Sequence, residues 1–132
     1  MYDKSDPRAS LAASKPASML NQTGLVAEEQ AATFYDSAPQ LTDASGRTWL
    51  HRGYNFLVAY SLAEPGAEFA RDAQEDEYCV LLPQNGAEIL WNGETVQVPG
   101  NSIAFVPAGA SCVTSPEGGE LVRLFTTRNA DL

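Results

Sequence analysis

The sequence predicts an all-β fold: a single antiparallel β-barrel of the jelly-roll type with an extended N-terminal arm. Three observations indicate this fold. After residue 46, turn-forming Gly, Pro and Asn recur about every 8–12 residues, the spacing of sandwiches and barrels. The segments between these turns are rich in β-branched and aromatic residues. The chain of 132 residues with 44% hydrophobic residues is the size of one domain with one core.

The N-terminal part differs in composition from the rest of the chain. Residues 1–20 are rich in Ser, Ala, Lys and Pro and contain few large apolar side chains, which is typical of a flexible tail. We therefore expect a tail over 1–20 and one barrel domain over 21–132.

The strand pattern is clearest over residues 55–63. Phe56, Val58, Tyr60 and Leu62 alternate with Asn55, Leu57, Ala59 and Ser61, so both faces of this strand are partly apolar. Residues 121–126 show the same two-sided pattern. One face would pack on the core and the other would be covered, which predicts a homodimer.

A tight hairpin is predicted between residues 87–91 and 94–98. Asn92 and Gly93 separate the two segments, and both residues tolerate the positive φ angles of a type I′ turn.

Charge excludes two classes of partner. The 17 acidic and 8 basic residues give a net charge of −9, which repels nucleic acid and anionic membrane surfaces. No apolar run is long enough to span a bilayer and no secretory signal is recognisable, so we expect a cytoplasmic protein. Two cysteines, Cys79 and Cys112, form neither a disulfide framework nor a zinc motif.

Residues 46–127 contain two glycine-marked segments in a recognisable order. The first begins at Gly66, and the second contains Gly100 followed, after six residues, by Pro107-Ala108-Gly109. This arrangement resembles the cupin superfamily of small, RmlC-like jelly-roll barrels. The resemblance implies sharp turns at these glycines and a small-molecule site inside the barrel.

The resemblance also marks where cupins carry metal ligands. The two histidine positions of the first motif correspond to Asp72 and Gln74, the acidic position to Glu77, and the histidine position of the second motif to Cys112. Because an amide, two carboxylates and a thiol are a poor set for a late transition metal, we expect no metal, no cofactor and no catalytic residue.

The function expected from the resemblance is a metal-free small-molecule binding or assembly module. Its ligand-binding residues would line the barrel pocket, and two buried acids there would favour a neutral or cationic ligand. These residues are Asp72, Gln74, Glu77, Cys112, Tyr60 and Phe105.

Several alternatives remain at this stage. The chain could be an enzyme acting on a small sugar or carboxylic acid, either through a metal held by Asp72, Gln74, Glu77 and Cys112 or, without a metal, through His51 and an acid. A partner could instead supply the chemistry. The acids over 64–77 could also be a solvated edge, and the cysteines could be plain core residues.

Overall fold

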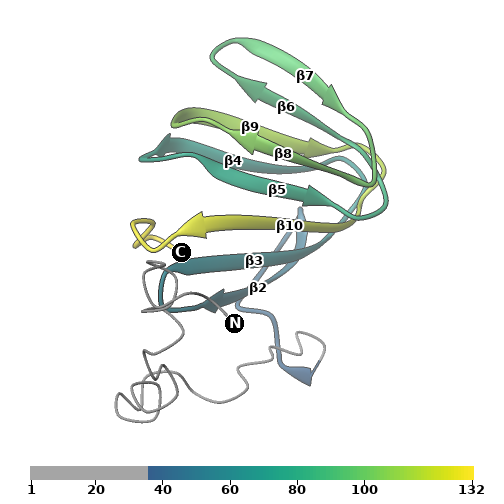
Figure 1. Ribbon diagram of the computed structural model, residues 1–132. Coiled ribbons are helices and arrows are strands. Elements are labelled where there is room, and N and C mark those ends of the chain that lie inside the picture. The colour runs from purple at the N-terminus through teal and green to yellow at the C-terminus, as the bar shows by residue number, and fades with distance from the viewer. Residues whose placement is uncertain (1–35) are drawn as a thin grey trace, which may run out of the picture. The chain divides into compact units, whose positions relative to one another are not determined.

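The structure, a computed structural model, describes residues 36–132, which fold into two antiparallel β-sheets packed face to face (Figure 1). Within this range, no helix is long and apolar enough to cross a membrane. The strands are β1 (Leu41–Asp43), β2 (Gly46–Arg52), β3 (Phe56–Ala63), β4 (Ala67–Gln74), β5 (Tyr78–Leu82), β6 (Ala87–Trp91), β7 (Glu94–Val98), β8 (Ser102–Val106), β9 (Gly109–Ser115) and β10 (Gly119–Thr126).

The order of strands is that of a jelly roll. One sheet has six strands in the order β1-β2-β3-β10-β5-β8, and the other has four in the order β4-β9-β6-β7. From β3 onward the chain passes repeatedly between the sheets, so residues distant in sequence meet in the interior. The predicted all-β jelly roll is confirmed. The predicted tail over 1–20, the extended arm and residues 21–35 of the predicted domain lie outside the described residues.

The hairpin between β6 and β7 is also confirmed. Asn92 has a φ of 50° and Gly93 a φ of 77°, the positive pair that a type I′ turn requires. This turn sets the register that pairs Trp91 with Glu94 and Ala87 with Val98.

The core lies between the sheets and is built by alternation along the strands. In β3, Leu57 and Ala59 are buried among core residues, whereas Val58 lies on the opposite, outer face. In β10, Leu121 and Phe125 face the core in the same way, and Arg123 lies between them in the alternation. A charged side chain is therefore placed on the interior face.

Two of the motif glycines adopt positive φ angles, and a third has a different role. Gly66 and Gly109 have φ angles of 81° and 108°, which only glycine adopts readily. Gly100 instead lies against the backbone of Gln84, where an added Cβ would be 1.9 Å from the carbonyl oxygen. Its glycine is therefore required by close approach of two chain segments.

The residues after β10 fold back against one end of the sandwich. Arg52 donates hydrogen bonds to the carbonyl oxygens of Asn129 (2.9 Å) and Leu132 (2.8 Å). The side chain of Leu132 packs against the hydrophobic core. Residues 127–132, here named the C-terminal segment, therefore close this end of the interior.

Candidate functional site

A group of buried and partly buried polar side chains lies in the interior beside the C-terminal segment. It contains side chains from both sheets and from the C-terminal segment, and we name it the interior polar cluster. Because buried polar groups destabilise a fold unless they are paired, each member needs an identified partner. Its members are Arg71, Gln74, Tyr78, Ser111, Arg123 and Asn129.

Two hydroxyl groups join the two sheets in this cluster. The hydroxyls of Tyr78 on β5 and Ser111 on β9 share a hydrogen bond of 2.9 Å. The Tyr78 ring also stacks on Phe125, with the ring centroids 4.9 Å apart. Burial raises the pKa of Tyr78, and its hydrogen bond to Ser111 acts in the opposite direction. The phenol therefore stays neutral at physiological pH.

Arg71 on β4 has a complete set of partners. Its Nε donates to Oε1 of Gln74 at 2.8 Å, and one terminal nitrogen donates to Oδ1 of Asn129 at 3.2 Å. Its two terminal nitrogens contact the two carboxylate oxygens of Asp131 at 2.6 and 3.1 Å. This hydrogen bonding lowers the pKa of Asp131. A bidentate carboxylate thus neutralises Arg71.

Arg123 on β10 lacks such partners. Only 6% of its surface is exposed, and its buried Nε has no hydrogen-bond partner within residues 36–132. Its guanidinium carbon lies 4.6 Å from the ring centroid of Phe69 and 5.7 Å from that of Phe125. Burial lowers the pKa of Arg123 to about 10, so the side chain is still charged at neutral pH.

Asp76, in the turn between β4 and β5, is hydrogen-bonded to two members of this cluster. It accepts hydrogen bonds from Thr126 (2.6 Å), Gln74 (3.3 Å) and Asn129 (3.5 Å). The Thr126 hydrogen bond is the main cause of its lowered pKa, with a smaller electrostatic effect of Arg128. Asp76 is therefore bound chiefly by neutral donors.

The strand β4 places Asp72 and Gln74 on different sides, which differs from the sequence-based expectation. Ala67 and Phe69 face the core, so Arg71 continues the interior face and Asp72 is exposed. A bulge follows, because Arg71 pairs with Ser111 and Gln74 with Gly109. The extra residue turns Gln74 into the interior, where it is buried.

Glu77 and the two cysteines also lie away from the interior. Tyr78 and Val80 take the interior face of β5, so Glu77 is exposed and Cys79 faces outward, its pKa raised by burial and by Glu77. Cys112 faces outward on β9, in the other sheet. The two thiols therefore do not line one pocket.

The predicted aromatic walls are divided in the same way. Tyr60 is buried on the outer side of the six-stranded sheet, where its ring lies 5.8 Å from that of Trp49 and its hydroxyl donates to Glu120. Phe105 is 67% exposed. His51 lies on the outer face of β2, beside Val58. The six predicted site residues do not converge on one interior site.

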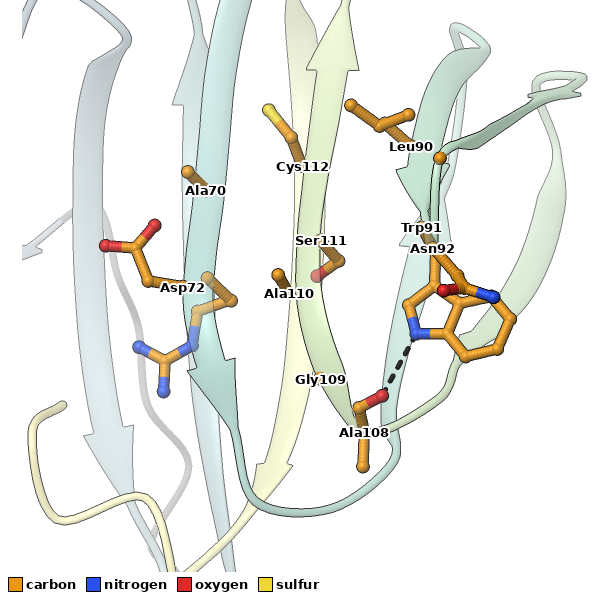
Figure 2. A pocket seen from close by; sticks show the side chains of 12 residues that line it. Ala70, Asp72, Leu90, Trp91, Asn92, Ala108, Gly109, Ala110, Ser111 and Cys112 are labelled. Atoms are coloured by element: carbon orange, nitrogen blue, oxygen red, sulfur yellow. Dashed lines mark hydrogen bonds between the residues drawn. The ribbon is translucent and has the colours of Figure 1, made fainter.

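A pocket of about 430 Å³ collects two of the predicted residues (Figure 2). Asp72 and Cys112 line it together with the small side chains of Ala70 and Ala110 on neighbouring strands. The indole nitrogen of Trp91 closes one end by donating to the carbonyl oxygen of Ala108 at 3.0 Å. Phe105 lines a separate pocket of about 150 Å³, near the β7 and β8 edges.

The interior residues do not fit a divalent cation. Within the described range, no three His, Cys, Asp or Glu side chains come together as metal ligands. The interior polar cluster also contains two guanidinium groups, and the unpaired one would repel a cation in a low-dielectric setting.

Sequence reasoning overlooked the arginines. Arg123 shares a strand face with Leu121 and Phe125, so an arginine between two large apolar residues was visible in the sequence. Arg71 continues the alternation of Ala67 and Phe69 and directly precedes the position matched to the family histidine. The motif spacing, rather than the strand phase, directed attention to Asp72.

Comparison with solved structures identifies the fold. An RmlC-like cupin from Shewanella frigidimarina superposes with a TM-score of 0.65 and 14% identity over 80% of this chain and 97% of that chain. KdgF from Halomonas sp. superposes with a TM-score of 0.61 and 14% sequence identity, over 74% of this chain and 92% of that chain. The cupin domain of Schizosaccharomyces pombe Cnp3 superposes with a TM-score of 0.58 and 14% sequence identity, over 77% of each chain. No protein-family model and no curated protein sequence matches the chain.

The class defined by this architecture is the two-sheet antiparallel jelly roll. Within that class, the described part of the chain has the cupin fold, as the sequence motifs suggested.

Proposed function

We propose that this chain is a metal-free binding module that holds a small molecule between its two sheets. The observation that carries the proposal is the interior polar cluster, which places hydrogen-bonding groups and a charge inside an otherwise apolar core. Ligand sites combine apolar walls with a few polar groups in this way. The free thiols of Cys79 and Cys112 support a reducing compartment, so we also propose the cytoplasm.

The metal-dependent alternative has less support. Its four ligands were Asp72, Gln74, Glu77 and Cys112, but only Gln74 faces the interior. The preference for a neutral or cationic ligand depended on Asp72 and Glu77 facing the interior, and both are exposed. The positions of these residues therefore support neither the four-ligand metal site nor the preference for a neutral or cationic ligand.

Two measurements test the binding proposal. Mass spectrometry of small molecules extracted from the purified protein, and thermal shifts with neutral sugars, amines and carboxylates, should identify at least one class that binds. Elemental analysis after expression with added Zn, Mn, Fe and Ni should find no stoichiometric metal. A metal bound once per chain, or no binding in any class, would contradict the proposal.

We also propose that two copies associate through the outer face of the six-stranded sheet. In adjacent strands, Val58, Leu124, Cys79 and Phe105 form one row across this face, and Tyr60, Val122, Leu81 and Ile103 form the next. Ile103 and Phe105 are 60% and 67% exposed. Neither row contains a charged residue, so two copies with a charge of −9 can meet here with little repulsion.

Light scattering tests the assembly proposal. We expect a dimer that dissociates when Phe105 is changed to Glu, whereas Thr95→Glu, an exposed position on the other sheet, should leave it intact. A wild-type protein that is monomeric at micromolar concentration would overturn this proposal.

A further inference from the structure

Two arginines in the interior have contrasting surroundings. The guanidinium carbons of Arg71 and Arg123 lie 5.3 and 5.7 Å from the ring centroid of the same residue, Phe125. Arg71 is bound by Gln74, Asn129 and Asp131. Arg123, by contrast, makes cation–π contacts with Phe69 and Phe125, and its buried Nε has no hydrogen-bond acceptor within residues 36–132.

The partner of Arg71 indicates what an arginine in this location binds. The Asp131 carboxylate contacts it through both oxygens, in the paired arrangement that the planar guanidinium favours. Arg123 presents the same kind of group, and no carboxylate of residues 36–132 forms an ion pair with it.

The acids near the cluster do not neutralise Arg123. Asp131 is engaged by Arg71, and Asp76 is held by Thr126, Asn129 and Gln74. Asp43 contributes only the smallest of the electrostatic effects acting on Arg123. Within residues 36–132, one positive charge in the interior therefore has no counterion, an arrangement that destabilises a fold unless an anion is bound.

We propose that Arg123 anchors a carboxylate site in the interior and that the small molecule is a monocarboxylate. The inference rests on the proposed binding function and specifies its ligand. A single negative charge matches the single uncompensated positive charge, whereas a phosphate monoester would exceed it. The rings of Phe69 and Phe125 beside the guanidinium provide an apolar surface for the rest of the molecule.

One route into the interior leads past the C-terminal segment, which binds Arg71 and packs against the core. Its contacts with Arg52 and Arg71 are hydrogen bonds and an ion pair near the surface, with Asp131 62% exposed. Such contacts open at low free-energy cost compared with core strands.

The test uses the full chain with benzoate and acetate as probes and with benzamide and acetamide as their uncharged counterparts. Titration calorimetry measures binding, and inorganic phosphate is added as a separate ligand. The variants are Arg123→Met, which removes the charge, Arg123→Lys, which keeps the charge without the planar fork, and Arg128→Met as a control at an exposed cation. Circular dichroism melts verify that each variant is folded.

We expect at least one carboxylate to bind saturably and its amide not to bind. Arg123→Met should weaken that binding at least tenfold, and Arg128→Met should change it less than twofold. If Arg123→Met does not fold, a weakening in Arg123→Lys supports the site, and unchanged binding there overturns it.

Other outcomes separate the inference from the function on which it rests. Equal binding of amide and carboxylate, or binding unaffected by Arg123→Met, would refute the carboxylate site while the binding function stands. Binding of phosphate without any carboxylate would refute the ligand class. If sugars, amines, carboxylates and phosphate all fail to bind, the proposed function itself is wrong.

Discussion

Changing Arg123 to Met should stabilise the ligand-free protein. Burial lowers the pKa of Arg123 by more than two units from its ordinary value, to about 10. At about 1.36 kcal/mol for each pKa unit, the charged side chain destabilises the folded state by about 3 kcal/mol. Because the folded pKa is the lower one, this penalty is fully present below pH 10 and decreases as the pH rises through that value.

The substitution also removes favourable contacts. The two cation–π contacts of Arg123 contribute about 0.5–2 kcal/mol, which partly offsets the relief of burial. The net gain is therefore about 1–2 kcal/mol, which corresponds to a Tm increase of about 4 °C or more for a domain of this size.

Urea unfolding and thermal melts at neutral pH without added ligand measure this effect, with Arg71→Met as the matched control. Arg71 is fully paired, so its loss leaves Gln74 and Asp131 without their partner and should destabilise the protein by about 1–3 kcal/mol. The reasoning is refuted if both substitutions change stability in the same direction, or if Arg123→Met lowers it by more than about 1 kcal/mol.

Three further predictions follow from single contacts. Gly100→Ala should destabilise the protein by about 3 kcal/mol or more in urea unfolding, because the added Cβ would overlap the Gln84 carbonyl. As a control, Gly93→Ala adds a Cβ that meets no atom within 4 Å, so it should cost only about 1–2 kcal/mol, because of the positive φ of this residue. Because its pKa is raised, Tyr78 contributes fully to stability below pH 10, and this contribution is lost as the pH rises beyond that value. Tyrosinate absorbance should show one tyrosine that titrates late and is missing in Tyr78→Phe. An identical titration in the variant would contradict the burial of Tyr78. Because its pKa is lowered, Asp131 contributes fully to stability above pH 3.8, and this contribution is lost as the pH falls below that value. In thermal melts across acid pH, the Tm of Asp131→Asn should therefore fall less steeply than that of the wild type. Parallel Tm curves would exclude the contact with Arg71.

The sequence predicted the architecture because the relevant signals are local. Alternation over residues 55–63 and the Asn92-Gly93 turn depend on neighbouring residues, and the structure confirms the jelly roll and the hairpin. The arrangement of the candidate site residues differed from the expectation because it depends on which residues of β4 face the interior. The motif spacing matched Asp72 to a ligand position, but Phe69 sets the interior face, and the bulge shifts Gln74 relative to Asp72.

The charge of the interior could not be predicted from local pattern alone. Arg123 lies on β10, and the residues around it come from β4 and β5 as well as from β10 itself. Within residues 36–132, Arg123 has no counterion because the C-terminal segment forms its ion pair with Arg71 instead. Such a deficit arises only when all of these segments are assembled.

The bulge in β4 means that adding or removing one residue in this strand changes which side chains face the interior. Gln74 reaches the interior because one extra residue separates its pairing position from that of Arg71. Deleting a residue such as Ala73 would leave every remaining interior residue chemically unchanged and yet alter the path that brings Gln74 to Arg71. Among related barrels, gain or loss of an interior group can therefore arise from a single insertion or deletion, and homologous positions are better compared by strand face than by alignment column.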